Sequence, residues 1–183
     1  MTKITIAIII ILAVAIAGGF FLFSNGKDDS QTVALGDLSA TEKEKFDKAP
    51  DFTLKDYGGN DVSLSDFSGK IRVVNSWAVW CPFCVDELPD FGRLQEEFGD
   101  QIAVIAIDRA ESREKTKKFT DELGITDMFI LLLDPKDSFY KSIGGFSMPE
   151  TLFIDGEGNI RIHKRGPMTF EEMKEKVESI LNS

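Results

Sequence analysis

A strand pattern, a cysteine pair and a helix pattern follow one another directly in this chain, and their order constrains the fold more than any other feature. The run "IRVVNSW", Ile71 to Trp77, is rich in β-branched residues and is typical of a buried central strand. Cys81 and Cys84, the only two cysteines in the sequence, come next. Apolar residues then recur at helical spacing as far as Phe98. The sequence therefore predicts a strand-to-helix junction that carries Cys81.

The flanking segments continue an α/β pattern. Apolar pairs on both sides of "YGGN" predict a hairpin, and Pro89 is expected to bend the helix after the cysteines. Thr169 and Glu172 form a capping-box pattern before a last amphipathic helix. We expect one α/β domain with a mixed sheet and helices on both faces. The other predicted elements are strands 102–108 and 128–134, helices 112–124 and 136–145, and a hairpin over 151–164.

The first residues predict a membrane anchor. Ile4 to Phe23 carries no charge over 20 positions, and a helix of that length spans about 30 Å, the thickness of a bilayer core. A cleaved signal peptide is the alternative, but its apolar run is shorter and ends at a small-residue site, unlike "GGFFLFSNG". Lys3 precedes the run and Asp28 and Asp29 follow it, which favours a cytoplasmic N-terminus. We therefore expect a signal-anchor over 1–23, a polar linker over 24–48 and a folded domain over 49–183.

The acidic composition excludes one large class of partner. The chain has 31 acidic and 21 basic residues, a formal charge of −10. No basic patch stands out to neutralise phosphates, so we expect no nucleic-acid binding. A solvated acidic surface accounts for the charge.

The cysteine pair has three interpretations. A structural zinc site needs four ligands, and only His163, about 80 residues on, could be added. A structural disulfide across so short a loop removes little entropy from the unfolded chain. A redox pair accounts for the spacing, because backbone N–H groups and the dipole at a helix start stabilise a Cys81 thiolate. Cys81 would attack a disulfide, and Cys84 would then resolve the mixed disulfide.

The segment "APDFTLKDYGGNDVSLSDFSGKIRVVNSWAVWCPFCVDELPDF" resembles the TlpA/ResA branch of membrane-anchored thioredoxin-like proteins, related to the AhpC/TSA and Redoxin families. The resemblance implies a thioredoxin-like fold with an N-terminal β-hairpin extension and a central insertion over about 110–146. It also implies an extracytoplasmic thiol-disulfide oxidoreductase on the cytoplasmic membrane, working through a Cys81–Cys84 disulfide without a further cofactor. Its partners would be disulfide-containing proteins, as in cytochrome c or copper-site maturation, and a membrane thiol reductant of the CcdA/DsbD type.

The same resemblance assigns further site residues. Glu87 matches the family acid, which would shift the cysteine pKa values and move a proton, although a solvated helix glutamate fits its position equally well. Pro149 matches the family's cis-proline, which turns the Met148 backbone toward the cysteines and an extended substrate. Trp80 matches the family tryptophan beside the first cysteine.

The residues between the two cysteines depart from the usual family pattern. Pro82 and Phe83 stand there, which leaves the redox potential and the choice of partner open. Asn75 stands where thioredoxin itself has a buried acid.

Two other functions compete with this interpretation. "APDF" also opens peroxiredoxins, but their P-x-x-x-T pattern before the reactive cysteine is absent here. A copper-binding assembly factor would use both cysteines with Met148 or His163 as soft ligands. Apart from that alternative, we expect His163 to be an exposed strand residue, and we assign no chemistry to Asp108 and Asp134 at the ends of strands.

Overall fold

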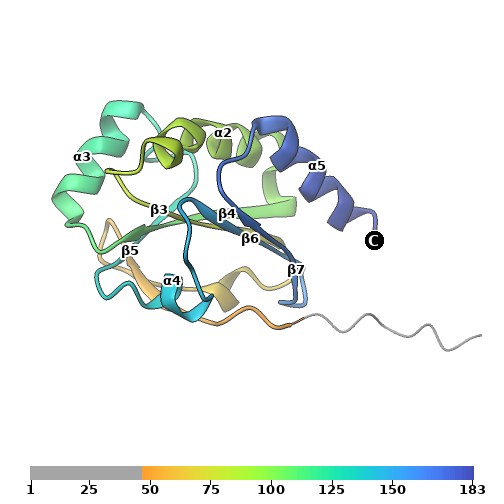
Figure 1. Ribbon diagram of the computed structural model, residues 1–183. Helices are drawn as coiled ribbons and strands as arrows, with labels where there is room; N and C mark the ends of the chain where they lie inside the picture. The colour runs from red at the N-terminus through yellow and green to blue at the C-terminus, as the bar shows by residue number, and fades with distance from the viewer. Residues whose placement is uncertain (1–46) are drawn as a thin grey trace, which may run out of the picture. The chain divides into compact units, whose positions relative to one another are not determined.

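The computed structural model describes residues 47–183, which form a single layered α/β unit (Figure 1). The predicted anchor over 1–23 and nearly all of the linker over 24–48 lie outside these residues. Within 47–183, no helix has the length and apolar character needed to cross a bilayer.

A seven-stranded mixed sheet forms the middle layer, in the order β2-β1-β5-β4-β3-β6-β7. Its central strands β3, β4 and β5 run parallel, and the outer strands add to them in antiparallel fashion. All seven residues of β3 are buried, as its β-branched run predicts. The strands are β1 (Thr53–Asp56), β2 (Asp61–Ser63), β3 (Ile71–Trp77), β4 (Ile102–Arg109), β5 (Ile130–Asp134), β6 (Glu150–Ile154) and β7 (Ile160–Arg165).

Helices cover both faces of this sheet, as predicted. Helices α2 and α5 lie on one face and the short α4 on the other (Figure 1). Phe91 of α2 and Val177 of α5 belong to one apolar cluster, whereas Phe139 of α4 belongs to a second. The helices are α2 (Pro82–Phe98), α3 (Arg113–Leu123), α4 (Ser138–Ser142) and α5 (Phe170–Leu181), with 3-10 turns η1 (Leu64–Phe67) and η2 (Gly99–Gln101).

Several predicted boundaries differ from the structure; the helix predicted over 136–145, for example, is α4 and covers only Ser138–Ser142. Strand β5 begins at Ile130 rather than at residue 128, because the Met128 N–H donates to the Ile125 carbonyl and closes a turn there. Asp47, the first described residue, already bonds to the domain, since its carbonyl accepts the Ile160 N–H. The segment predicted as a central insertion holds α3, β5 and α4.

Helix α5 begins with the predicted capping box. The Thr169 hydroxyl accepts the Glu172 N–H, and the Glu172 carboxylate accepts the Thr169 N–H. We expect Thr169→Ala to lower the free energy of unfolding by about 1 kcal/mol, because the Glu172 N–H loses its side-chain acceptor. Urea denaturation measures the change, with Ser179→Ala in the same helix as a control that stays within about 0.5 kcal/mol. An equal effect of the two substitutions would contradict the role of the cap.

Candidate active site

The sheet brings three chain segments together at one edge. Strand β3 ends at Trp77, and its parallel neighbour β4 places Asp108 directly beside that residue. Strand β6 runs the opposite way, so its first residue, Glu150, pairs with Ser76 near the end of β3. The cysteine loop, the end of β4 and the segment before β6 therefore meet at the same edge.

Cys81 and Cys84 are joined in a disulfide at the start of α2. Their Cα atoms are 5.3 Å apart. Cys81 is the N-cap residue, and its Sγ accepts the Cys84 N–H at 3.2 Å. In the reduced protein this amide and the positive end of the helix dipole stabilise a thiolate on Cys81. Cys81 is 3% exposed and Cys84 is fully buried, so attack from outside is directed to Cys81.

Exposed aromatic side chains flank the disulfide. Trp80 is 60% exposed and Phe83 is 59% exposed, although both are large and apolar. Pro82 is exposed as well and occupies the first turn of α2, where its missing N–H costs no helical bond. Trp80, Pro82 and Phe83 therefore form an exposed apolar surface around the disulfide.

Glu87 lies one helical turn beyond Cys84 and is buried, so its interpretation as a solvated helix glutamate is wrong. Its Oε1 accepts the Asn75 amide at 3.0 Å, and its Oε2 accepts the Met168 N–H at 3.1 Å. Burial raises the pKa of Glu87 to about 8, although these two donors act in the opposite direction. A carboxyl group with that pKa exchanges protons near neutral pH.

Asn75 holds Glu87 in place from the sheet. Its Nδ2 donates to Glu87 and also to the Thr151 hydroxyl at 3.0 Å. Its Oδ1 is buried and accepts no hydrogen bond from a residue within 47–183. Rotation of the amide by half a turn would present this oxygen to a protonated Glu87, so Asn75 suits both states of the acid.

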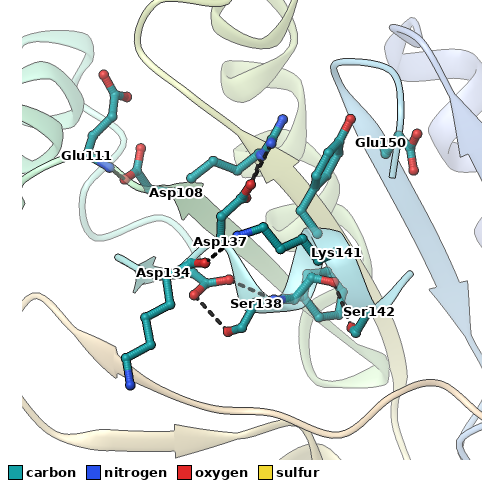
Figure 2. A network of polar contacts seen from close by, with 12 residues as sticks. Asp108, Glu111, Asp134, Asp137, Ser138, Lys141, Ser142 and Glu150 are labelled. Carbon is teal, nitrogen blue, oxygen red and sulfur yellow. Dashed lines mark hydrogen bonds and ion pairs between the residues drawn. The ribbon is translucent and has the colours of Figure 1, made fainter. Parts of the chain in front are cut away.

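A second pair of carboxyl groups supports the cysteine loop, and the sequence analysis missed it. The Val79 N–H donates to Glu111 at 2.6 Å, and the Glu111 N–H donates to Asp108 at 3.1 Å. Figure 2 shows Asp108 and Glu111 side by side at the end of β4. Burial and the nearby Glu111 raise the pKa of Asp108 well above its ordinary value. The signal available in the sequence was Asp108, an acidic residue that directly follows the apolar run from Ile102 to Ile107.

The structure places Met148 and Pro149 at the same edge, directly before β6. The peptide bond between them is cis, as the resemblance implied. Met148 packs against the apolar cluster that contains both cysteines. Within the described chain, neither its N–H nor its carbonyl takes part in a hydrogen bond. Its backbone is therefore available for pairing with a second chain.

His163 is partly buried and bonded, contrary to the expectation of an exposed strand residue. Its Nε2 lies 2.9 Å from a Glu150 carboxylate oxygen, and its side chain is 22% exposed. Since Glu150 is the first residue of β6 and follows Pro149 directly, His163 contacts the start of that strand and not the cysteines themselves. Within 47–183, no three His, Cys, Asp or Glu side chains are grouped so that they could hold a metal ion, so the zinc interpretation has no ligand set there.

The fold and this site define a class: the chain has a thioredoxin-like fold with a disulfide of the Cys-x-x-Cys type at its reactive edge. A structure described as a putative thiol:disulfide interchange protein DsbE from Chlorobium tepidum superposes with a TM-score of 0.69 at 27% identity. It covers 75% of this chain and 98% of its own.

Comparison of the sequence with known proteins identifies the family within this class. The AhpC/TSA family model matches residues 46–163. The thiol-disulfide oxidoreductase ResA of Geobacillus thermodenitrificans is 30% identical over 94% of this chain and 92% of its own length. The thioredoxin-like protein YneN of Bacillus subtilis is 37% identical over 72% and 77% of the two chains. The chain belongs to the AhpC/TSA family and, within it, to the ResA-like thiol-disulfide oxidoreductases.

The buried carboxyl group of Glu87 predicts a pH dependence of stability. Between pH 4.5 and about 8 the folded protein keeps a proton that the unfolded chain releases, so the free energy of unfolding falls as pH rises. The slope from one such group is at most about 1.4 kcal/mol per pH unit. Asp108 contributes with the same sign, so Glu87→Gln should remove only part of the decline.

Urea denaturation of the oxidised protein between pH 5 and pH 8 measures this slope. Glu87→Gln keeps an acceptor for Met168 and presents its NH₂ to a rotated Asn75. Glu96→Gln, at an exposed position on the same helix, is the matched control and should leave the slope unchanged. A slope that stays the same in Glu87→Gln would show that the acid is ionised throughout this range.

Proposed function

We propose that this protein is an extracytoplasmic, membrane-anchored thiol-disulfide oxidoreductase that reduces disulfides in proteins, for example during cytochrome c or copper-site maturation. The observation that carries the proposal is the placement of Cys81. It caps α2, accepts the Cys84 N–H and is joined to a fully buried Cys84. The oxidoreductase class is common to the relatives, whereas the substrate and the compartment are our proposal.

The reaction exchanges one disulfide for another. The Cys81 thiolate attacks a substrate sulfur, a Cys81–substrate disulfide forms, and the other substrate sulfur leaves as a thiolate. Cys84 then loses its proton and attacks the Cys81 sulfur. This step forms the Cys81–Cys84 disulfide and releases the second substrate thiolate. Two electrons pass to the substrate, one proton comes from Cys84 and the second comes from solvent, so the substrate leaves as a dithiol.

Glu87 fits the proton transfer in the second step. Cys84 is fully buried, so bulk water has little access to its thiol. Glu87 lies on the same helix one turn later and titrates near neutral pH, so it accepts the Cys84 proton, directly or through water, as the second attack begins. The same group would return a proton when the disulfide is reduced again.

The surroundings of the disulfide suit a polypeptide substrate. The Met148 backbone can pair with an extended substrate segment, while Trp80, Phe83 and Pro82 contact apolar residues on both sides of its cysteine. The two electrons would be restored by a membrane thiol reductant of the CcdA/DsbD type, which regenerates the Cys81–Cys84 dithiol.

A trapping experiment tests the two-step scheme. Cys84→Ser should accumulate a mixed disulfide with its substrate in cells, because the resolving thiol is gone, and Cys81→Ser should abolish exchange. Mass spectrometry of the trapped complex identifies the substrate. The scheme is wrong if Cys84→Ser captures nothing while both variants still reduce insulin.

Two other results would support the alternative functions. Rapid consumption of peroxide that survives in Cys84→Ser would support a peroxide reductase. Tight one-to-one Cu(I) binding without disulfide exchange would support the copper-binding alternative.

The location is tested with a membrane-impermeant maleimide on intact cells. The uncharged run from Ile4 to Phe23, preceded by Lys3, supports a catalytic domain outside the cytoplasm. A single new cysteine, Glu96→Cys at an exposed position, placed in a chain with both Cys81→Ser and Cys84→Ser, should react in intact cells and sediment with membranes. Labelling that requires cell lysis, or a thiol recovered only in the soluble fraction, would overturn the proposed topology.

A further inference from the structure

The buried carboxylate of Glu150 holds the segment that presents Met148. Its Oε1 accepts the N–H groups of Phe146 and Ser147, at 2.9 and 3.0 Å, and the Ser147 hydroxyl at 3.3 Å. The side chain is completely buried although it carries a charge. A buried carboxylate with so many donors fixes the backbone that supplies them.

Two basic side chains of β7 complete the surroundings of Glu150. His163 lies 2.9 Å from its Oε2, and the Nε of Arg165 lies 3.5 Å from its Oε1. Arg165 also stacks 5.0 Å from the ring of Phe146, which is 77% exposed beside the reactive edge. Burial alone would raise the pKa of Glu150, but its backbone donors and His163 outweigh that effect and hold the pKa below its ordinary value.

The carbonyl of Ser147 is held from the other side by Tyr140. The Tyr140 hydroxyl donates to this carbonyl at 2.7 Å. The guanidinium of Arg109 lies 3.3 Å from the centre of the tyrosine ring, and both of its bonds to Asp137 are 2.8 Å long. Figure 2 shows Asp137 in this cluster and Glu150 on the separate strand β6. Two independent supports therefore converge on one peptide segment.

Gly145 allows the segment before Met148 to pack closely against the Tyr140 ring. A Cβ atom on Gly145 would lie 2.5 Å from the Tyr140 ring, so only glycine lets the segment pass this close to the tyrosine. The Gly145 N–H donates to the Tyr140 carbonyl at 3.0 Å. Residues 145–147 are thus held at successive peptide groups, and Met148, the next residue, makes no backbone hydrogen bond within 47–183.

We propose that Glu150 and Tyr140 are positioning residues that fix the Ser147 backbone and thereby hold the Met148 edge in the geometry that binds a protein substrate. This role rests on the proposed reduction of protein disulfides. It predicts that the two residues govern affinity for a polypeptide and leave sulfur chemistry at Cys81 unchanged, because neither is at the disulfide. Without these two supports, the backbone at Met148 would have to become ordered when the substrate binds, and this ordering would weaken binding.

A comparison of two disulfides tests the proposal. The pre-reduced full chain, purified in detergent, is mixed with excess insulin, and its remaining thiols are counted by alkylation over a range of insulin concentrations. The second reagent is dithiobis(nitrobenzoate), a small disulfide that needs no backbone pairing. Glu150→Ala should raise the half-saturating insulin concentration about five- to tenfold, since buried donors lose their acceptor. The limiting rate and the rate with the small disulfide should stay within about twofold.

Two further variants separate positioning from general damage. Glu150→Gln keeps a carbonyl oxygen for Phe146 and Ser147 and presents its NH₂ to His163, so it should restore affinity to within about threefold of the wild type. Asp155→Ala is the matched control, because Asp155 binds two backbone N–H groups at the other end of β6 and pairs with Arg161 of β7. It should leave both reactions unchanged.

The outcomes distinguish this inference from the proposed function. An unchanged insulin affinity in Glu150→Ala, or an equal loss with both reagents, would overturn the positioning role. If Glu150→Ala does not fold, Tyr140→Phe decides, because it removes only the hydroxyl that holds Ser147 and should raise the half-saturating concentration about threefold. No rise would overturn the proposal. A wild-type chain that reacts with the small disulfide but not with insulin would instead overturn the reduction of protein disulfides.

Discussion

The hydrogen bond from the Cys84 N–H to the Cys81 sulfur is the contact on which this site depends. It forms because β3, buried along its whole length, ends at Trp77 and the chain turns into α2 with Cys81 as the cap. That turn aims the Cys84 N–H at the Cys81 sulfur and buries the sulfur of Cys84. The same strand supplies Asn75, which bonds to Glu87, so the position of β3 determines the environment of both the sulfur atoms and the acid.

Three buried carboxyl groups surround the reactive edge, and their partners give them different properties. Among the described residues, two neutral donors bond to Glu87, so burial dominates and its pKa rises. Asp108 lies beside another carboxylate, which raises its pKa as well. Glu150 has backbone donors and basic side chains, and its pKa is lowered. One edge of the sheet therefore combines groups that can exchange protons near neutral pH with a carboxylate, Glu150, whose lowered pKa favours the charged form and which supports the backbone.

The sequence predicted those parts of the molecule that depend on local patterns. The β-branched run gave β3 its bounds, Ser112 and Gly124 bracketed α3, and the Thr169 capping box marked the start of α5. The family resemblance supplied the cis bond before Pro149. The properties of Glu87 could not be predicted, since they depend on Asn75 and Met168, which lie 12 and 81 positions away. His163 was placed on the correct hairpin, but its partner Glu150 lies on the opposite strand and was not foreseen.

The first described residues enter the domain far from the disulfide. Asp47 and Lys48 bond to Ile160 and Asn159, beside the turn that joins β6 to β7. Glu150, next to the reactive edge, is at the other end of β6, five residues or roughly 17 Å away. The described chain therefore enters the domain at the end of the sheet opposite the sulfur atoms, so Asp47 and Lys48 leave the reactive edge uncovered.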